Sequence, residues 1–186
     1  IPEELVSLAL HELTWPGHPL GWDVAGTPDS VNGLGRDGLV SFLHQHYGPS
    51  NIVVSVAGDV QHQQVVDMAA ALLGDWQAAP TPSYIAAPVN GVGPRVALVS
   101  KKVEQSHLAL HLPGLPRDHQ ERFVLGLLNV ILGEGMSSRL FLEIRERLGL
   151  AYSVDSYVST LADTGVTGVY AAVAPDRVLE ALAAIL

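Results

Sequence analysis

A proline-rich stretch in the middle of the chain constrains the fold more than any other feature of the sequence. Residues 77–94, QAAPTPSYIAAPVNGVGP, hold four prolines and few charges. Proline fixes one backbone torsion and removes an amide donor, so such a stretch is typical of a linker. It predicts an α+β domain that ends within residues 1–78, a linker over 79–94, and a second α+β domain over 95–186.

Apolar spacing predicts helices and strands on both sides of this linker. Before it we expect helices over 2–13, 36–47 and 63–76, the last one closed by Gly74 at its C′ position, and a buried strand over 51–60. After it we expect strands over 95–102 and 105–114, helices over 117–133 and 138–149, a hairpin over 150–174, and a final helix over 175–186. Residues 65–73 and 178–186 match in character, which indicates either a duplicated unit or two ordinary strand–turn–helix segments.

Composition narrows the range of functions. The net charge is −9, which argues against nucleic acid or an anionic membrane as the main partner. No cysteine is present, so a metal site would need His, Asp or Glu. Residues 1–80 carry nine acids and one base, a net of −8, whereas residues 81–186 carry ten acids and nine bases, a net of −1. This asymmetry suggests two units with different surfaces.

The eight histidines form no recognisable metal motif. His11 and Glu12 begin the pattern His-Glu-x-x-His, but Trp15 stands where the second histidine would be. His44 and His46 splay apart on a helix, and His107 and His111 lie roughly 13 Å apart along a strand. A structural or surface role is therefore expected for all of them.

Two further segments have simple explanations. Ser137 and Ser138 lack the Gly-x-Ser-x-Gly elbow of a nucleophile and are expected to cap the following helix. The glycine-rich run at 33–38, GLGRDG, follows no strand and so is not a phosphate loop.

The helix–strand junction at 135–156, GMSSRLFLEIRERLGLAYSVDS, gathers an unusual number of charges. Leu140, Ile144 and Leu148 share one helix face, and Arg139, Glu143 and Glu146 share another. Arg145 and Tyr152 both lie near the junction, where a guanidinium and a phenol together could donate hydrogen bonds to a carbonyl or a carboxylate. An ordinary solvent-exposed face is the alternative.

These segments resemble the pitrilysin/insulinase (M16) zinc peptidases, in the branch of the mitochondrial processing peptidase and its bacterial relatives. The resemblance runs over nearly the whole chain and is most specific at NVILGEGMSSRLFLEIRERLGLAYSVDS, residues 129–156. It implies a LuxS/metallopeptidase-like α+β fold, in which an antiparallel-rich sheet carries helices on one face and the unit is duplicated. The chain would be a fragment that holds part of copy one and most of copy two, the so-called inactive domain.

The resemblance also implies a function. The parent would cleave peptides or unfolded segments with a zinc-activated water, and the zinc ligands, His-x-x-Glu-His and a later Glu, would lie upstream of Ile1. No residue of this chain matches a catalytic or metal-ligand position. Arg145 and Tyr152 match the family's Arg-x6-Tyr pattern and would bind substrate, whereas the glycine-rich loop at 132–139 is short for a specialised gating role.

The partners implied are a peptide substrate, the remainder of the same peptidase chain, and a second subunit in a homodimer or heterodimer, with no nucleic acid and no membrane. The lack of a targeting sequence says nothing in a fragment whose true N-terminus is missing, and a cytoplasmic location is the default expectation. Two alternatives stay open: a non-catalytic subunit or scaffold of the same family, and an unrelated α+β binding domain.

Overall fold

The computed structural model describes residues 1–77, 83–88 and 93–186 and divides the chain into two compact units. Unit 1 joins Ile1–Val24 with Ala86–Leu186, and unit 2 is Ala25–Ile85. The first helix thus belongs with the second half of the chain. The predicted linker over 79–94 lies partly outside the described residues, at 79–82 and 89–92, and the domain boundary that it marks stays a prediction.

Unit 1 is built on a three-stranded antiparallel sheet, which confirms the α+β class. The strands β1 (Ser106–Pro113), β2 (Ala151–Thr160) and β3 (Gly165–Val173) lie in the order β1-β3-β2. β2 and β3 form the predicted hairpin, and its turn is closed by the Leu161 amide, which donates to the Thr164 carbonyl at 2.8 Å. β3 is central and its side chains are mostly buried.

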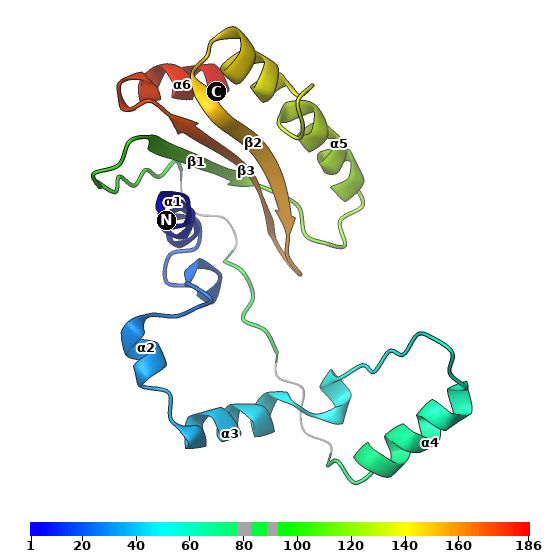
Figure 1. Ribbon diagram of the computed structural model, residues 1–186. Helices are drawn as coiled ribbons and strands as arrows, with labels where there is room; N and C mark the ends of the chain where they lie inside the picture. Colours follow the sequence, from blue (N-terminus) through cyan, green and yellow to red (C-terminus); the bar gives the residue numbers. More distant parts are fainter. Residues whose placement is uncertain (78–82, 89–92) are drawn as a thin grey trace. The chain divides into compact units, whose positions relative to one another are not determined.

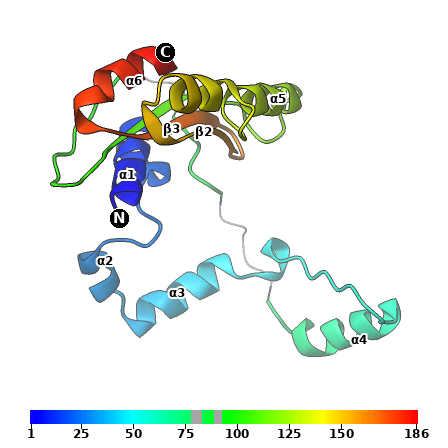
Figure 2. The same cartoon turned by 45° about the horizontal axis from the view of Figure 1, so that its top comes forward.

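One face of this sheet carries three helices and the core (Figures 1 and 2). They are α5 (Arg122–Leu132), the π-helix η3 (Phe141–Arg147) and α6 (Val178–Ile185), which follows a 3₁₀ turn at Pro175–Arg177. The side chains buried together are Leu140, Ile144, Leu150, Ala151, Val154, Val169, Ala171, Val173 and Ala181. Alternate residues of β2 and β3 point into this layer because side chains of a strand alternate between faces.

The other face of the sheet is covered by α1 (Pro2–Thr14), which a 3₁₀ turn at Pro19–Gly21 follows (Figure 2). Thr14 of α1 hydrogen-bonds to His111 of β1 at 2.7 Å, whereas Leu110, next to it in β1, packs against the core on the opposite face. The resemblance implied helices on one face of the sheet only, whereas in this unit helices lie on both faces. α1, which the sequence-based boundary assigned to the first domain, covers the second face.

Unit 2 is helical in its described residues. It contains α2 (Pro28–Asn32), α3 (Arg36–His46), a 3₁₀ turn at Pro49–Asn51 and α4 (His62–Leu73). The helices predicted over 36–47 and 63–76 are confirmed. Gly74 does follow α4, but with a right-handed φ of −62° rather than the left-handed backbone of a C′ glycine.

Two predicted strands, 51–60 and 95–102, are wrong. Both segments are extended or irregular, and their apolar side chains face outward: Val53 is 91% exposed and Leu98 is 93% exposed. A β-branched run becomes a strand only when another strand supplies its hydrogen bonds, and no described residue pairs with either segment. Because the first half of the repeat at 65–73 lacks its strand, the duplication also stays a prediction.

Candidate functional site: an arginine between two aromatic rings

The segment that carries the candidate site begins at a buried serine. Ser138 is 1% exposed, and its Oγ accepts a hydrogen bond from the amide of Phe141 at 3.4 Å, which confirms the predicted capping role. Leu140 and Ile144 are buried at 4% and 0% exposure, as their helical spacing predicted. This apolar face fixes the helix against the sheet and turns the opposite face outward.

The helix winds as a π-helix over Phe141–Arg147 rather than as an α-helix. Its last turn closes when the amide of Leu148 donates to the carbonyl of Glu143 at 3.0 Å, five residues back. π-Helical turns are rare and are often found at functional sites. The sequence predicted a helix here and gave no sign of this winding.

Two backbone features then bring Tyr152 back toward the helix. Gly149 has φ +58°, a left-handed conformation that reverses the chain without the steric penalty of a side chain. The register of β2 on β3 shifts between Ala151 and Ser153, so Tyr152 is the extra residue of a β-bulge. Bulges redirect side chains and are common beside active sites. Tyr152 is 76% exposed, whereas Ala151 beside it is only 6% exposed.

Arg145 lies between two aromatic rings as a result. Its guanidinium carbon is 4.8 Å from the ring centre of Phe141 and 4.8 Å from that of Tyr152. Both distances lie within the range of a cation–π contact. The structure therefore brings together the two residues that the sequence singled out, and it adds Phe141, which sequence reasoning missed. The sequence spacing could have indicated this contact, since Phe141 precedes Arg145 by one helical turn.

The guanidinium of Arg145 keeps its donors free. The nearest carboxylate oxygen is Oε1 of Glu146, 3.8 Å from the Arg145 Nε, too far for a hydrogen bond. Within the described residues the Arg145 side chain donates no hydrogen bond, and it is 37% exposed. Arg147, by contrast, is bound by both carboxylate oxygens of Glu143, with Nε to Oε2 at 2.7 Å. The two ring contacts use none of the N–H groups of Arg145, which leaves these donors for an acceptor such as a carbonyl or a carboxylate.

A second polar cluster lies on the opposite face of the sheet, under α1. Thr14 donates to the Leu10 carbonyl at 2.6 Å, so its Oγ1 is an acceptor for His111 Nδ1 at 2.7 Å. His111 Nε2 is then the acceptor for the hydroxyl of Tyr157 at 2.8 Å. This chain of bonds places the proton of His111 on Nδ1 and keeps the ring neutral.

Burial, and to a smaller extent the neighbouring His11, whose ring centre is 5.3 Å away, lower the pKa of His111 to about 4. Burial likewise raises the pKa of Tyr157. His111 has both nitrogens engaged by protein groups, which makes it a structural residue. Nothing in the sequence pattern indicated that Tyr157 would be its partner, because that pairing depends on strand register.

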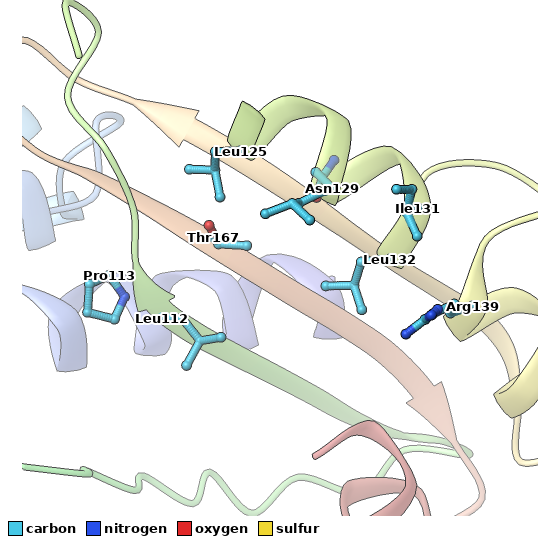
Figure 3. A pocket seen from close by; sticks show the side chains of 9 residues that line it. Leu112, Pro113, Leu125, Asn129, Ile131, Leu132, Arg139 and Thr167 are labelled. Atoms are coloured by element: carbon cyan, nitrogen blue, oxygen red, sulfur yellow. The ribbon is translucent and has the colours of Figure 1, made fainter. Parts of the chain in front are cut away.

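A cavity of about 380 Å³ lies between α5 and the edge of the sheet (Figure 3). Its wall is mostly apolar, and its polar groups come from Asn129, Arg139 and Thr167. Neither Arg145 nor Tyr152 lines it. The cavity is therefore separate from the stacked arginine, and its walls provide no nucleophile or acid–base pair.

The other histidines considered in the sequence form no functional site within the described residues. His46 stacks on Phe42, with ring centres 4.2 Å apart, and His107 hydrogen-bonds to Tyr170 at 2.8 Å. Across residues 1–77, 83–88 and 93–186, no cluster of three or more His, Asp or Glu could hold a metal ion. Within the same residues, no helix is both long and apolar enough to span a bilayer.

Comparison with known proteins places the chain. The family model of the peptidase M16 inactive domain matches residues 33–186. An uncharacterized zinc protease of Streptomyces coelicolor is 45% identical over 170 residues, which are 88% of this chain and 37% of that protein. The zinc protease YmxG of Bacillus subtilis is 34% identical over 169 residues, 91% of this chain and 41% of that protein.

Solved structures agree with the fold. The peptidase M16 inactive domain from Pseudomonas fluorescens has a TM-score of 0.88 at 24% identity. The matched region covers 99% of this chain and 45% of the Pseudomonas chain. A protease from Helicobacter pylori has a TM-score of 0.82 at 28% identity, covering 96% of this chain and 44% of its own. The chain thus spans less than half the length of the relatives it matches. It belongs to the M16 zinc peptidase family and contains that family's inactive domain.

Proposed function

We propose that this chain forms the substrate-binding, non-catalytic part of a zinc-dependent peptidase that hydrolyses peptides or unfolded segments. The observation that carries the proposal is the Arg145 guanidinium in contact with the rings of Phe141 and Tyr152, with its N–H groups not hydrogen-bonded to any described residue. An extended peptide presents a carbonyl oxygen at every residue, and each of these oxygens can accept from a guanidinium or a phenol. Arg145 and Tyr152 would hold one such oxygen from two directions.

Among the described residues, no group of three or more His, Asp or Glu side chains could hold a metal ion. The relatives from Streptomyces and Bacillus are described as zinc proteases, which supports zinc in the family. We propose that the ligands belong to a part of the peptidase outside this chain. The role of this chain is then to bind and orient the peptide, with Arg145 also placed to neutralise negative charge that develops on a bound carbonyl oxygen.

The peptide, the remainder of the peptidase and a related subunit are the partners that this function needs. Arg145 and Tyr152 cannot cleave a peptide by themselves, since neither activates water at neutral pH and no nucleophile adjoins them. A peptide held here must therefore be presented to a catalytic group supplied by another part of the assembly. A homodimer, or a heterodimer with a catalytic relative, would meet that requirement.

The test is peptide hydrolysis by the complete protein with Arg145→Ala and Tyr152→Ala. Each variant is expected to raise KM for an extended peptide about tenfold, the loss of one or two hydrogen bonds to a charged or phenolic donor. Arg177→Ala is the matched control, because the Arg177 side chain is also 37% exposed but pairs with Glu180 on α6. Unchanged KM in both site variants would exclude the binding role.

A complete protein with no zinc and no hydrolysis, in the absence of a partner, would instead indicate the non-catalytic subunit. Metal analysis of the purified protein distinguishes the two forms of the proposal. In the second form, the same Arg145 and Tyr152 variants are assayed in the complex with the catalytic relative.

A further inference from the structure

We propose that Phe141 is a positioning residue, whose ring holds the Arg145 guanidinium in the orientation in which Arg145 meets the peptide. The inference rests on the proposed function, and it adds a residue for which neither the sequence pattern nor the family resemblance indicated a role. Its basis is a comparison of how the side chains of Arg145, Arg147 and Arg177 are held in place.

Arg147 and Arg177 are oriented by carboxylates. Each places Nε and one Nη on the two oxygens of a glutamate one helical turn away, Glu143 and Glu180 respectively. Such bidentate pairing fixes the plane of a guanidinium, and it also uses the donors that would bind a ligand. These two arginines are therefore held in place but are poorly disposed to bind a peptide.

Arg145 is oriented in a different way. Its contact with Glu146 is 3.8 Å, longer than a hydrogen bond, so a carboxylate does not fix its plane. Its guanidinium carbon lies 4.8 Å from the centres of two rings, and these cation–π contacts restrict the side chain without using its N–H groups. A flexible side chain loses less freedom on binding when its bound conformation is already favoured.

The two rings do not contribute in the same way. Tyr152 reaches Arg145 from β2 through the bulge and is 76% exposed, and its hydroxyl is itself a donor for the peptide. Phe141 lies one turn before Arg145 in the same π-helix, is partly buried, and has no polar group to offer. Its contact with Arg145 is therefore set by the helix itself and exists before any peptide binds. Orientation of the guanidinium is the function that remains for this ring.

Phe141→Leu in the complete protein tests the inference, because leucine keeps an apolar side chain of helical propensity and removes the ring. We expect KM for an extended peptide to rise about two- to fivefold with kcat nearly unchanged, the factor that one exposed cation–π contact represents. Phe141→Tyr, which restores a ring, is expected to recover the original KM. Phe123→Leu is the matched control, since Phe123 stacks on Arg122 at 4.4 Å on α5, away from the clamp.

A spectroscopic measurement separates orientation from catalysis. The ring current of Phe141 shifts the Nε–Hε resonance of Arg145, which NMR assigns by its loss in Arg145→Lys. Phe141→Leu should displace that resonance, Phe141→Tyr should restore it, and Phe123→Leu should leave it in place. An unmoved resonance in Phe141→Leu would overturn the inference whatever happens to hydrolysis.

The remaining outcomes distinguish this inference from the proposed function. If Phe141→Leu moves the resonance without changing KM, while Arg145→Ala raises KM, the positioning role is overturned and the clamp stands. If Arg145→Ala leaves KM unchanged, the positioning role fails, and if Tyr152→Ala leaves KM unchanged as well, the proposed function fails with it. A rise in KM that Phe141→Tyr reverses, together with the restored resonance, supports both.

Discussion

The hydroxyl of Tyr157 lies 2.8 Å from Nε2 of His111, although the two residues belong to strands that do not touch. Gly168 of the central strand β3 is the register partner of both. Because Gly168 has no side chain, the two rings meet above its backbone. A Cβ at this position would lie 2.6 Å from Cε1 of the Tyr157 ring, closer than real Cβ atoms come to other atoms.

Gly168→Ala is therefore expected to push Tyr157 away and break its bond to His111. We expect a loss of about 1–3 kcal/mol in the free energy of unfolding, the usual cost of overpacking together with an unpaired buried acceptor. Denaturant unfolding measures this loss. Gly126→Ala is the control: a Cβ there meets nothing within 4 Å, and alanine in the middle of α5 should stabilise by about 0.5–1 kcal/mol. Equal effects of the two substitutions would contradict the packing argument.

His111 should make stability depend on pH. Its pKa is about 4 in the folded protein and 6.5 in the unfolded chain, so the unfolded chain binds more protons between these values. The stability it contributes is complete above pH 6.5 and is lost as the pH falls toward 4, by roughly 1–2 kcal/mol once solvent screening of this partly exposed ring is allowed for. His111→Gln, which does not titrate, should flatten the profile of unfolding free energy in this window. A slope that is the same in both proteins would assign it to other groups.

Local patterns predicted the parts of the fold that depend on local interactions. The spacing of Leu140 and Ile144 predicted which helix face is buried, and the alternation in 150–174 predicted the β2–β3 hairpin. The false strands at 51–60 and 95–102 have the right composition but no described neighbour to pair with. A strand is a property of a pair, so its sequence alone cannot establish it.

The same distinction applies to the candidate site. The identities of Arg145 and Tyr152 were predictable from their spacing and the family resemblance. Their contact depends on the π-helical turn and on the bulge at Tyr152, which are set by hydrogen bonds to Glu143 and by the pairing with β3. These depend on how the whole unit packs and carry no signature in a single sequence.

Gly149 should be the backbone position on which the Arg145–Tyr152 contact depends. Its φ of +58° disfavours residues with a side chain, although a Cβ there would meet no atom within 4 Å. Gly149→Ala is expected to cost about 1–2 kcal/mol in unfolding free energy, and Gly149→Asn less, because asparagine tolerates the left-handed conformation. Chemical denaturation of the two variants separates backbone strain from crowding. Equal losses in the two would show that φ is not the cause.

Thr167 should respond to substitution in the opposite sense from Thr14. The Oγ1 of Thr167 lies in the wall of the α5 cavity, is buried, and has no hydrogen-bond partner among the described residues (Figure 3). Thr14 Oγ1, in contrast, bonds to both Leu10 and His111. Thr167→Val removes a buried hydroxyl that makes no hydrogen bond to a described residue. It should therefore leave the unfolding free energy unchanged or raise it by up to about 1 kcal/mol. Thr14→Val removes two bonds and leaves the Nδ1 of His111 without a partner, at a cost of about 1–3 kcal/mol. Thermal or denaturant unfolding of the pair is the measurement, and a destabilised Thr167→Val would mean that this hydroxyl is paired in the working protein.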